Sequence, residues 1–275
     1  MKKSLLFWIL SFIITISSAV YQRVTGPTYP VTGKVTIGGK EISYKFDRSH
    51  PGESNHVVSI KTDDESISGF LEWKRFKTSD EFIREPMIYR DGILSAELPH
   101  QPPAGKLEYH VTIRSGDETI QIPGNKSVVI RFRGDVPLVI LIIHVLIMFI
   151  GMLIATRAGL ETFTAEPKLK KFIYWTIGLL SLGGLILGPI VQWYSFGAFW
   201  TGWPFGKDLT DNKTALIILA WIVAAIALKK AKNPKRWTLA AAIITFVVYL
   251  IPHSVLGSEL DYSKIDKSTV SEFKN

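Results

Sequence analysis

Five stretches of this chain are apolar and almost free of charge. The first covers residues 4–20, within an N-terminal segment of residues 1–22. The other four are expected over residues 136–156, 172–191, 214–230 and 237–252. Because a helix rises about 1.5 Å per residue, about 20 apolar residues cross a hydrocarbon core of about 30 Å. The sequence therefore predicts a four-helix membrane domain over residues 135–252, preceded by one N-terminal helix.

A different pattern fills residues 23–134, where apolar and polar positions alternate over short segments. Such alternation predicts strands with one buried face, and Gly38-Gly39 and Gly116-Asp117 predict tight hairpin turns. The expected strands are residues 35–37, 42–46, 57–61, 69–76, 93–98, 107–114, 119–122 and 128–132. Short strands at this density predict an all-β sandwich. The fold class is therefore α+β, a β-sandwich joined to an α-helical multi-pass membrane domain.

The net charge of +8 is distributed unevenly. Residues 21–135 contain sixteen Lys/Arg and sixteen Asp/Glu, so this part is neutral and offers no basic face for a nucleic acid. The excess lies in short segments beside the apolar runs: Lys2, Lys3, Arg157, Lys168, Lys170, Lys171, Lys229, Lys230, Lys232, Lys235 and Arg236. Short positive loops mark the cytoplasmic side of a membrane. We therefore expect a cytoplasmic (inner) membrane protein of bacterial type, with the β-sandwich, residues 192–213 and the polar tail 253–275 outside.

Recognisable catalytic sequence motifs are missing. There is no cysteine, no HExxH, no P-loop, no GxSxG and no dinucleotide fingerprint. We therefore predict no catalytic residue and no metal site. The first apolar run, with Ser17-Ser18-Ala19 near its end, fits both a cleaved signal peptide and a retained signal anchor. Either alternative exports the segment that follows.

The predicted outer loop, residues 192–213, is the most unusual stretch. Seven aromatic residues lie between Trp193 and Phe205. Aromatic rings favour the headgroup level of a bilayer, so the loop is either an interfacial belt or a lid over a pocket. The pocket hypothesis uses these residues of the loop: Gln192, Trp200, Trp203, Asp208 and Asp211. The two aspartates have a simpler interpretation as caps of the following helix.

Two histidines are candidate ligands for a cofactor. His144 lies about 12 Å inside the second run, where a polar side chain is costly and points into the bundle. It either bonds a neighbouring helix or, together with His253, binds haem or contacts a quinone. The other histidines, His50, His56, His100 and His110, show no ligand spacing and are interpreted as surface residues.

Small residues predict close helix packing. Gly151, Ala155 and Gly159 recur at every fourth position, and Gly184 and Gly188 form a GxxxG pair. Packing within the chain is one interpretation, and a homo-oligomer through Gly184 and Gly188 is the other. Two further local features are expected: Asp135 as an N-cap, and a bend of the third membrane helix at Pro189.

One stretch of the β region resembles fibronectin-III and immunoglobulin-like domains. Pro102-Pro103-Ala104-Gly105 precedes Leu107-Glu108-Tyr109-His110-Val111, which is similar to a corner followed by a strand, with a Tyr hydroxyl bonded to the backbone. The resemblance implies a sandwich with Trp73 as a core aromatic. It implies a binding or scaffolding role and no activity.

Three functions compete at this point. The first is a non-catalytic scaffold, sensor or assembly component of a membrane complex, whose partners would be the bilayer and another membrane or periplasmic protein. The second is a haem-binding or quinone-linked redox protein that uses His144 and His253. The third is a small transporter, although the spans lack Asp, Glu, Lys and Arg away from their ends.

Overall fold

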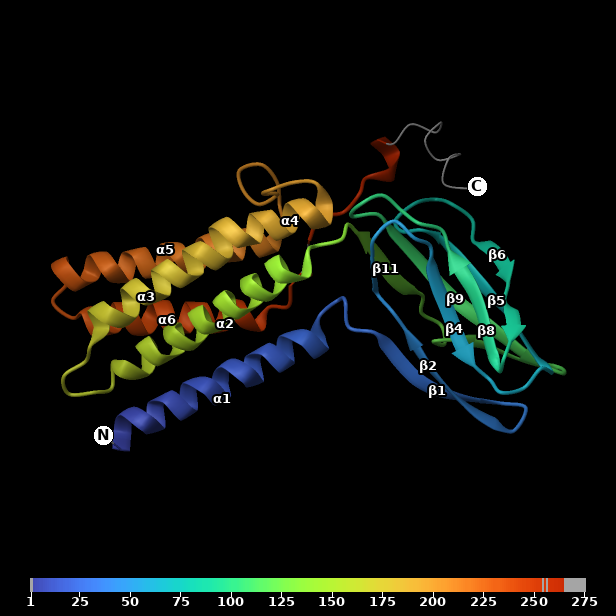
Figure 1. The fold of residues 1–275 in the computed structure, drawn as a ribbon, viewed down its shortest axis with the longest axis horizontal. Helices are drawn as coiled ribbons and strands as arrows, with labels where there is room; N and C mark the ends of the chain where they lie inside the picture. Colours follow the sequence, from blue (N-terminus) through green and yellow to red (C-terminus); the bar gives the residue numbers. More distant parts are fainter. Residues whose placement is uncertain (1, 254, 256, 265–275) are drawn as a thin grey trace. The chain divides into compact units, whose positions relative to one another are not determined.

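A computed structural model describes residues 2–253, 255 and 257–264 of the protein (Figure 1). The chain divides into two compact units. The helical unit comprises Met1–Pro27 and Val136–Ser258, and the β unit comprises Thr28–Asp135 and the segment that begins at Glu259. The expected tail, residues 253–275, is thus shared between the units, and residues 265–275 lie outside the described part.

The helical unit contains the predicted helices, several of them longer than expected. They are α1 (Lys2–Thr25), α2 (Leu138–Glu161), α3 (Leu169–Ser181), a π-helical segment (Leu182–Leu187), α4 (Gly188–Phe196), α5 (Leu209–Lys230) and α6 (Pro234–Leu250). Among the described residues, four helices are long and apolar enough to cross a membrane: α1, α2, the continuous run Leu169–Phe196 and α5. The fifth predicted span, α6, has 17 residues, the lower limit for a spanning helix.

Neighbouring helices of this unit pack through small residues, as the spacing predicted. α2 lies beside α1, α3 and α6, and α5 lies beside α3 and α6 (Figure 1). A Cβ at Gly151 would be 2.8 Å from Leu180 of α3, and one at Gly159 would be 2.7 Å from Ala242 of α6. Gly184 approaches Thr214 of α5 in the same way. Packing within the chain therefore accounts for these glycines, including one of the GxxxG pair.

The third span changes from α-helical to π-helical hydrogen bonding before Pro189. Residues Leu182–Leu187 are π-helical, and the Gly188 N–H donates to the Gly183 carbonyl five residues earlier. Proline has no N–H and crowds the preceding turn, so a local rearrangement of the bonding ladder is expected there. The disturbance lies one turn earlier than Pro189 itself. By contrast, the expected Asp135 cap is wrong: α2 has Pro137 as its N-cap, with no side-chain hydrogen bond, because the chain stays extended through this proline.

The β unit contains the eight expected strands and three short ones. Within the described residues the strands are β1 (Val31–Ile37), β2 (Lys40–Phe46), β3 (Ser49–Pro51), β4 (His56–Lys61), β5 (Ile67–Arg75), β6 (Ile83–Pro86), β7 (Ile88–Arg90), β8 (Ile93–Leu98), β9 (Lys106–Ser115), β10 (Glu118–Ile122) and β11 (Val128–Arg133). The unpredicted β3, β6 and β7 are three or four residues long. Such segments are too short to show an alternating pattern.

Three sheets surround one apolar core (Figure 1). β1 and β2 form a two-stranded sheet, and a second sheet has the order β4-β8-β7, with β4 also in contact with β2. The largest sheet has the order β3-β11-β9-β5-β6, and β10 pairs with β9. All of the pairs are antiparallel except β3 with β11. The hairpins at Gly38-Gly39 and Gly116-Asp117 are confirmed, because β1 and β2 pair directly, as do β9 and β10.

The two aromatic residues singled out in the sequence lie in this core. Trp73 is buried and Tyr109 is fully buried. The Tyr109 hydroxyl donates to the Asp47 carbonyl at 3.0 Å, and Asp47 lies 62 residues upstream rather than at the adjacent corner. Burial raises the pKa of Tyr109 above its usual range. The expected bond to backbone is present, but it ties β9 to the segment after β2.

Candidate binding site

The aromatic loop, residues 197–208, joins α4 to α5 and is fixed by one buried carboxylate. Residues 192–196 and 209–213, also expected in the loop, are helical. Asp211 Oδ2 accepts hydrogen bonds from Thr201 N at 2.7 Å, Gly202 N at 2.9 Å and Gln192 Nε2 at 3.2 Å. A Cβ on Gly202 would lie 2.6 Å from Asp211 Cβ, so only glycine permits this approach. The structure therefore brings Asp211 and Gln192 together: Asp211 accepts from the loop backbone, and Gln192 donates to the Asp211 side chain.

The neighbouring polar residues complete this fixation. The Asp208 side chain caps α5 by accepting from Thr210 N at 2.7 Å, which confirms the predicted cap. Its second oxygen accepts from Ser258 N at 2.9 Å. Asn212 Oδ1 accepts from Trp203 N at 2.7 Å. The two candidate carboxylates therefore satisfy backbone donors, and the loop has a defined shape.

Holding the backbone in this way leaves large aromatic side chains at the surface. Trp203 and Phe205 are 78% and 83% exposed. Phe199 is also exposed and stacks on Trp193 of α4 with ring centroids 5.7 Å apart. Trp200 Nε1 donates to the Trp203 carbonyl. An exposed aromatic patch on a fixed backbone is typical of a binding surface or of a headgroup contact.

The two candidate ligand histidines differ in their hydrogen bonds, although His144 is among the neighbours that help to lower the pKa of His253. His144 Nδ1 lies 3.0 Å from the Gly183 carbonyl oxygen, in the π-helical segment. A carbonyl only accepts, so Nδ1 donates, and the bond to a neighbouring helix that the sequence favoured is present. His253 is exposed. Among the described residues no hydrogen bond joins the two rings, and no group of three His, Cys, Asp or Glu is arranged to hold a metal ion.

Two polar side chains that the sequence did not single out close the end of α6 beside this loop. Gln22 of α1 donates to the Tyr249 carbonyl at 2.8 Å, and Lys213 of α5 donates to the Ile251 carbonyl at 2.7 Å. The last carbonyls of a helix have no partner within it, and in an apolar environment each needs a donor. Gln22 and Lys213 therefore satisfy the end of α6 from two neighbouring helices.

The opposite end of the helical unit holds a buried ion pair, Arg157 with Glu161. Their side chains are 3% and 7% exposed. Glu161 also accepts from Lys168 N at 2.9 Å. The Arg157 guanidinium lies 4.9 Å from the ring centroid of Phe172 and faces Phe7 and Trp8 of α1. The sequence analysis placed Arg157 in a basic loop, because a charged residue after position 156 suggested the end of the helix. The i,i+4 spacing of Arg157 and Glu161 was the signal that could have predicted the ion pair.

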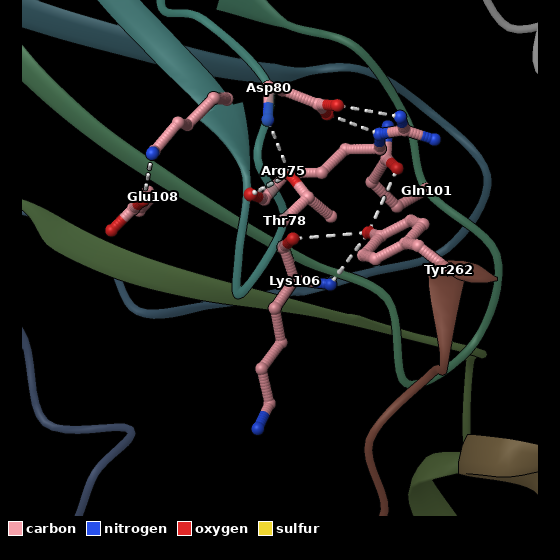
Figure 2. A network of polar contacts seen from close by, with 8 residues as sticks. Arg75, Thr78, Asp80, Gln101, Lys106, Glu108 and Tyr262 are labelled. Atoms are coloured by element: carbon pink, nitrogen blue, oxygen red, sulfur yellow. Dashed lines mark hydrogen bonds and ion pairs between the residues drawn. The ribbon is translucent and has the colours of Figure 1, made fainter.

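In the β unit, the segment after Glu259 packs against strands (Figure 2). The Tyr262 hydroxyl accepts from Lys106 N at 3.0 Å and lies 3.0 Å from Gln101 Oε1. Burial raises the pKa of Tyr262 to about 12. Glu259 forms ion pairs with Lys106 and Lys77, which lower the pKa of its carboxyl although burial alone would raise it. Part of the expected polar tail, the segment from Glu259 to Tyr262, is therefore held against the β unit.

The interpretation of all four β-unit histidines as surface residues is wrong for His56. It is 8% exposed, and its Nδ1 lies 3.2 Å from Nδ1 of His50. His50 and His100 both meet the ring of Phe132 edge-on. Burial, and then the neighbouring His50, lower the pKa of His56. The fold of the strands brings these three histidines together, so their spacing in the sequence did not predict the cluster.

Comparison with known proteins adds no assignment. The chain matches no family model, no curated protein and no solved structure. The class of protein thus rests on the fold: a β-sheet unit is joined to a helical unit, in which four helices of the described part are long and apolar enough to cross a membrane.

Proposed function

We propose that the protein is a non-catalytic component of a membrane complex in the cytoplasmic (inner) membrane. In this proposal the β unit, an immunoglobulin- or fibronectin-III-like domain, is exported as a binding domain, and the aromatic loop of the helical unit supplies a further contact for a membrane or periplasmic partner. The observation that carries the proposal is the aromatic loop. Asp211 of α5 accepts hydrogen bonds from the backbone of this loop, while Trp203 and Phe205 stay exposed.

The two ends of the helical unit differ in a way that supports this orientation. Lys235 Nζ donates to the Thr164 carbonyl at 2.9 Å, which brings the turn between α5 and α6 to the turn between α2 and α3. Both turns are rich in lysine. The aromatic loop lies at the other end, where Lys213 meets the end of α6. Basic turns favour the cytoplasmic side and aromatic rings favour the interface, so the aromatic end is proposed to face outward.

Packing of α1 supports a retained anchor rather than a cleaved signal peptide. Trp8 meets Phe172 of α3 with ring centroids 6.1 Å apart, and Gln22 bonds the end of α6. Removal of α1 would expose Arg157 and would leave α6 carbonyls without a donor. A helix with these contacts is part of the folded unit.

Protease protection tests the orientation, and a matched pair of variants tests the binding surface. Protease added to intact spheroplasts should cut the β unit and spare the turn at residues 229–236. Phe205→Ala should reduce cross-linking of the full-length protein to its membrane partners, whereas Phe163→Ala should not. Both phenyl rings are exposed, Phe205 by 83% and Phe163 by 67%, and they lie on different turns. Equal cross-linking by both variants would exclude the loop as the binding surface.

The redox alternative has one favourable feature. A histidine that ligates a metal usually donates its other N–H to a fixed acceptor, and His144 Nδ1 does so to Gly183. An absorbance spectrum of the purified protein decides between the two functions. A Soret band that His144→Leu abolishes would replace the scaffold proposal with the haem-binding one.

A further inference from the structure

The start of α3 contains a hollow that neither the pocket hypothesis nor the scaffold proposal uses. Its volume is about 630 Å³. The lining residues that matter here are Lys168, Lys170, Lys171, Leu169, Tyr174 and Trp175. Three lysine side chains and two aromatic rings thus border one hollow, on the turn and first helical turns that follow the buried Arg157–Glu161 pair.

The lysines of this hollow carry more positive charge than the carboxylates of the same turn offset. Lys168, Lys170 and Lys171 are exposed, and none of them forms an ion pair with another described residue. Of the two acids before them in this turn, Glu161 is already paired with Arg157. Glu166 is the other carboxylate of this turn, and its side chain is exposed. Three cations against one anion leave the hollow positively charged at neutral pH.

The aromatic part of the hollow lies directly beside these charges. Lys170 and Tyr174, and likewise Lys171 and Trp175, are four residues apart and share a face of the helix. Tyr174 and Trp175 are 46% and 58% exposed. Rings that are apolar on their faces and carry one polar atom are favoured at the headgroup level, and lysines favour contact with phosphate.

We propose that this hollow binds the headgroup of an anionic phospholipid from the membrane in which the helical unit lies. The lysines pair with the phosphate, while Leu169, Tyr174 and Trp175 cover the glycerol and the first acyl carbons. Basic pockets at the cytoplasmic ends of membrane helices bind lipids of this class. A soluble phosphate would use the cations alone, whereas the lining offers an apolar face as well. The inference rests on the helical unit being in a bilayer, and not on partner binding by the aromatic loop.

The chain supplies a control for charge alone. Lys229 and Lys230 end α5, are exposed, and belong to the other basic turn at the same end of the unit. They do not line the hollow. The double variants Lys170→Gln/Lys171→Gln and Lys229→Gln/Lys230→Gln remove the same charge, and glutamine keeps a similar helix propensity.

The test uses full-length protein in mild detergent, with lipid binding measured by native mass spectrometry against phosphatidylglycerol and phosphatidylcholine. The wild type should prefer phosphatidylglycerol. The Lys170/Lys171 variant should bind it about tenfold more weakly, and the Lys229/Lys230 variant should stay within about twofold of the wild type. Trp175→Ala should also weaken binding, although it changes no charge. Circular dichroism of each variant confirms that the helices are intact.

Two results would overturn the proposal. An equal loss of phosphatidylglycerol binding in both double variants would mean that the lipid responds to the total positive charge at this end of the helical unit. The hollow would then not be a specific binding site. Competition by inorganic phosphate at millimolar concentration, with Trp175→Ala unaffected, would assign the hollow to a soluble anion. Either result leaves the cross-linking comparison of Phe205→Ala with Phe163→Ala unchanged, so failure here is distinguishable from failure of the proposed function.

Discussion

Separating the buried pair Arg157–Glu161 should destabilise the helical unit strongly, whereas removing both charges should not. The two side chains are 3% and 7% exposed, and the guanidinium is enclosed by aromatic rings. Little water therefore reaches a charge that has lost its partner. Glu161→Gln leaves Arg157 as an isolated buried cation, and Arg157→Met leaves Glu161 as an isolated buried anion.

The size of the effect follows from burial. Breaking a buried pair on one side costs about 3–5 kcal/mol, while replacing the whole pair is close to neutral. Glutamine still offers an oxygen to Lys168 N, which now donates to Glu161. We therefore expect each single variant to lose about 3 kcal/mol or more, and the double variant to lose less than either.

The assay is a double-mutant cycle on the purified full-length protein, unfolded by dodecyl sulfate in mixed micelles and followed by its helical circular dichroism. The coupling energy should be at least about 2 kcal/mol. Lys34 and Glu41 of the β unit provide a control, because they form an ion pair whose side chains are 63% and 61% exposed. That cycle, measured on the unfolding of the β unit by its strand signal, should show no measurable coupling. Additive losses for Arg157 and Glu161 would refute the reasoning.

Three further outcomes are expected. Asp211→Ala removes the acceptor of two backbone N–H groups, a local loss of stability of about 2–4 kcal/mol, so amide hydrogen exchange in residues 197–208 should become faster. Asp211→Asn should lose less stability. Unchanged exchange would contradict this role. Burial, and then the neighbouring His50, lower the pKa of His56, although Asp47 acts to raise it, so the fold favours the neutral form of His56. That stability is complete above about pH 6.5 and falls as the pH drops further, so the β unit should melt at a lower temperature at about pH 5; His56→Phe should reduce the difference. Tyr262→Phe should release the segment from Glu259 to protease, since Lys106 N and Gln101 lose their partner; cleavage equal to that of the wild type would refute the role.

Local pattern was enough to predict most of the elements. Helices and strands followed from apolar runs and from alternation, because both depend on residues within a few positions of each other. The Gly38-Gly39 hairpin and the Asp208 cap followed for the same reason. Errors at this level were also local: the Asp135 cap failed beside a proline, and three strands were too short to be recognised.

The partners of polar side chains were decided by the tertiary structure alone. Asp211 could be chosen as a candidate from its position, but its bonds to Thr201 and Gly202 depend on how the loop turns back over α5. Tyr262 meets Lys106 across 156 residues of sequence, and Gln22 meets Tyr249 across 227. A hydrogen bond needs two atoms within about 3 Å, and for residues so far apart only the packed chain sets that distance. The sequence by itself thus determined which segments are helices and strands, while packing decided which of their polar groups are structural and which surfaces remain free to bind.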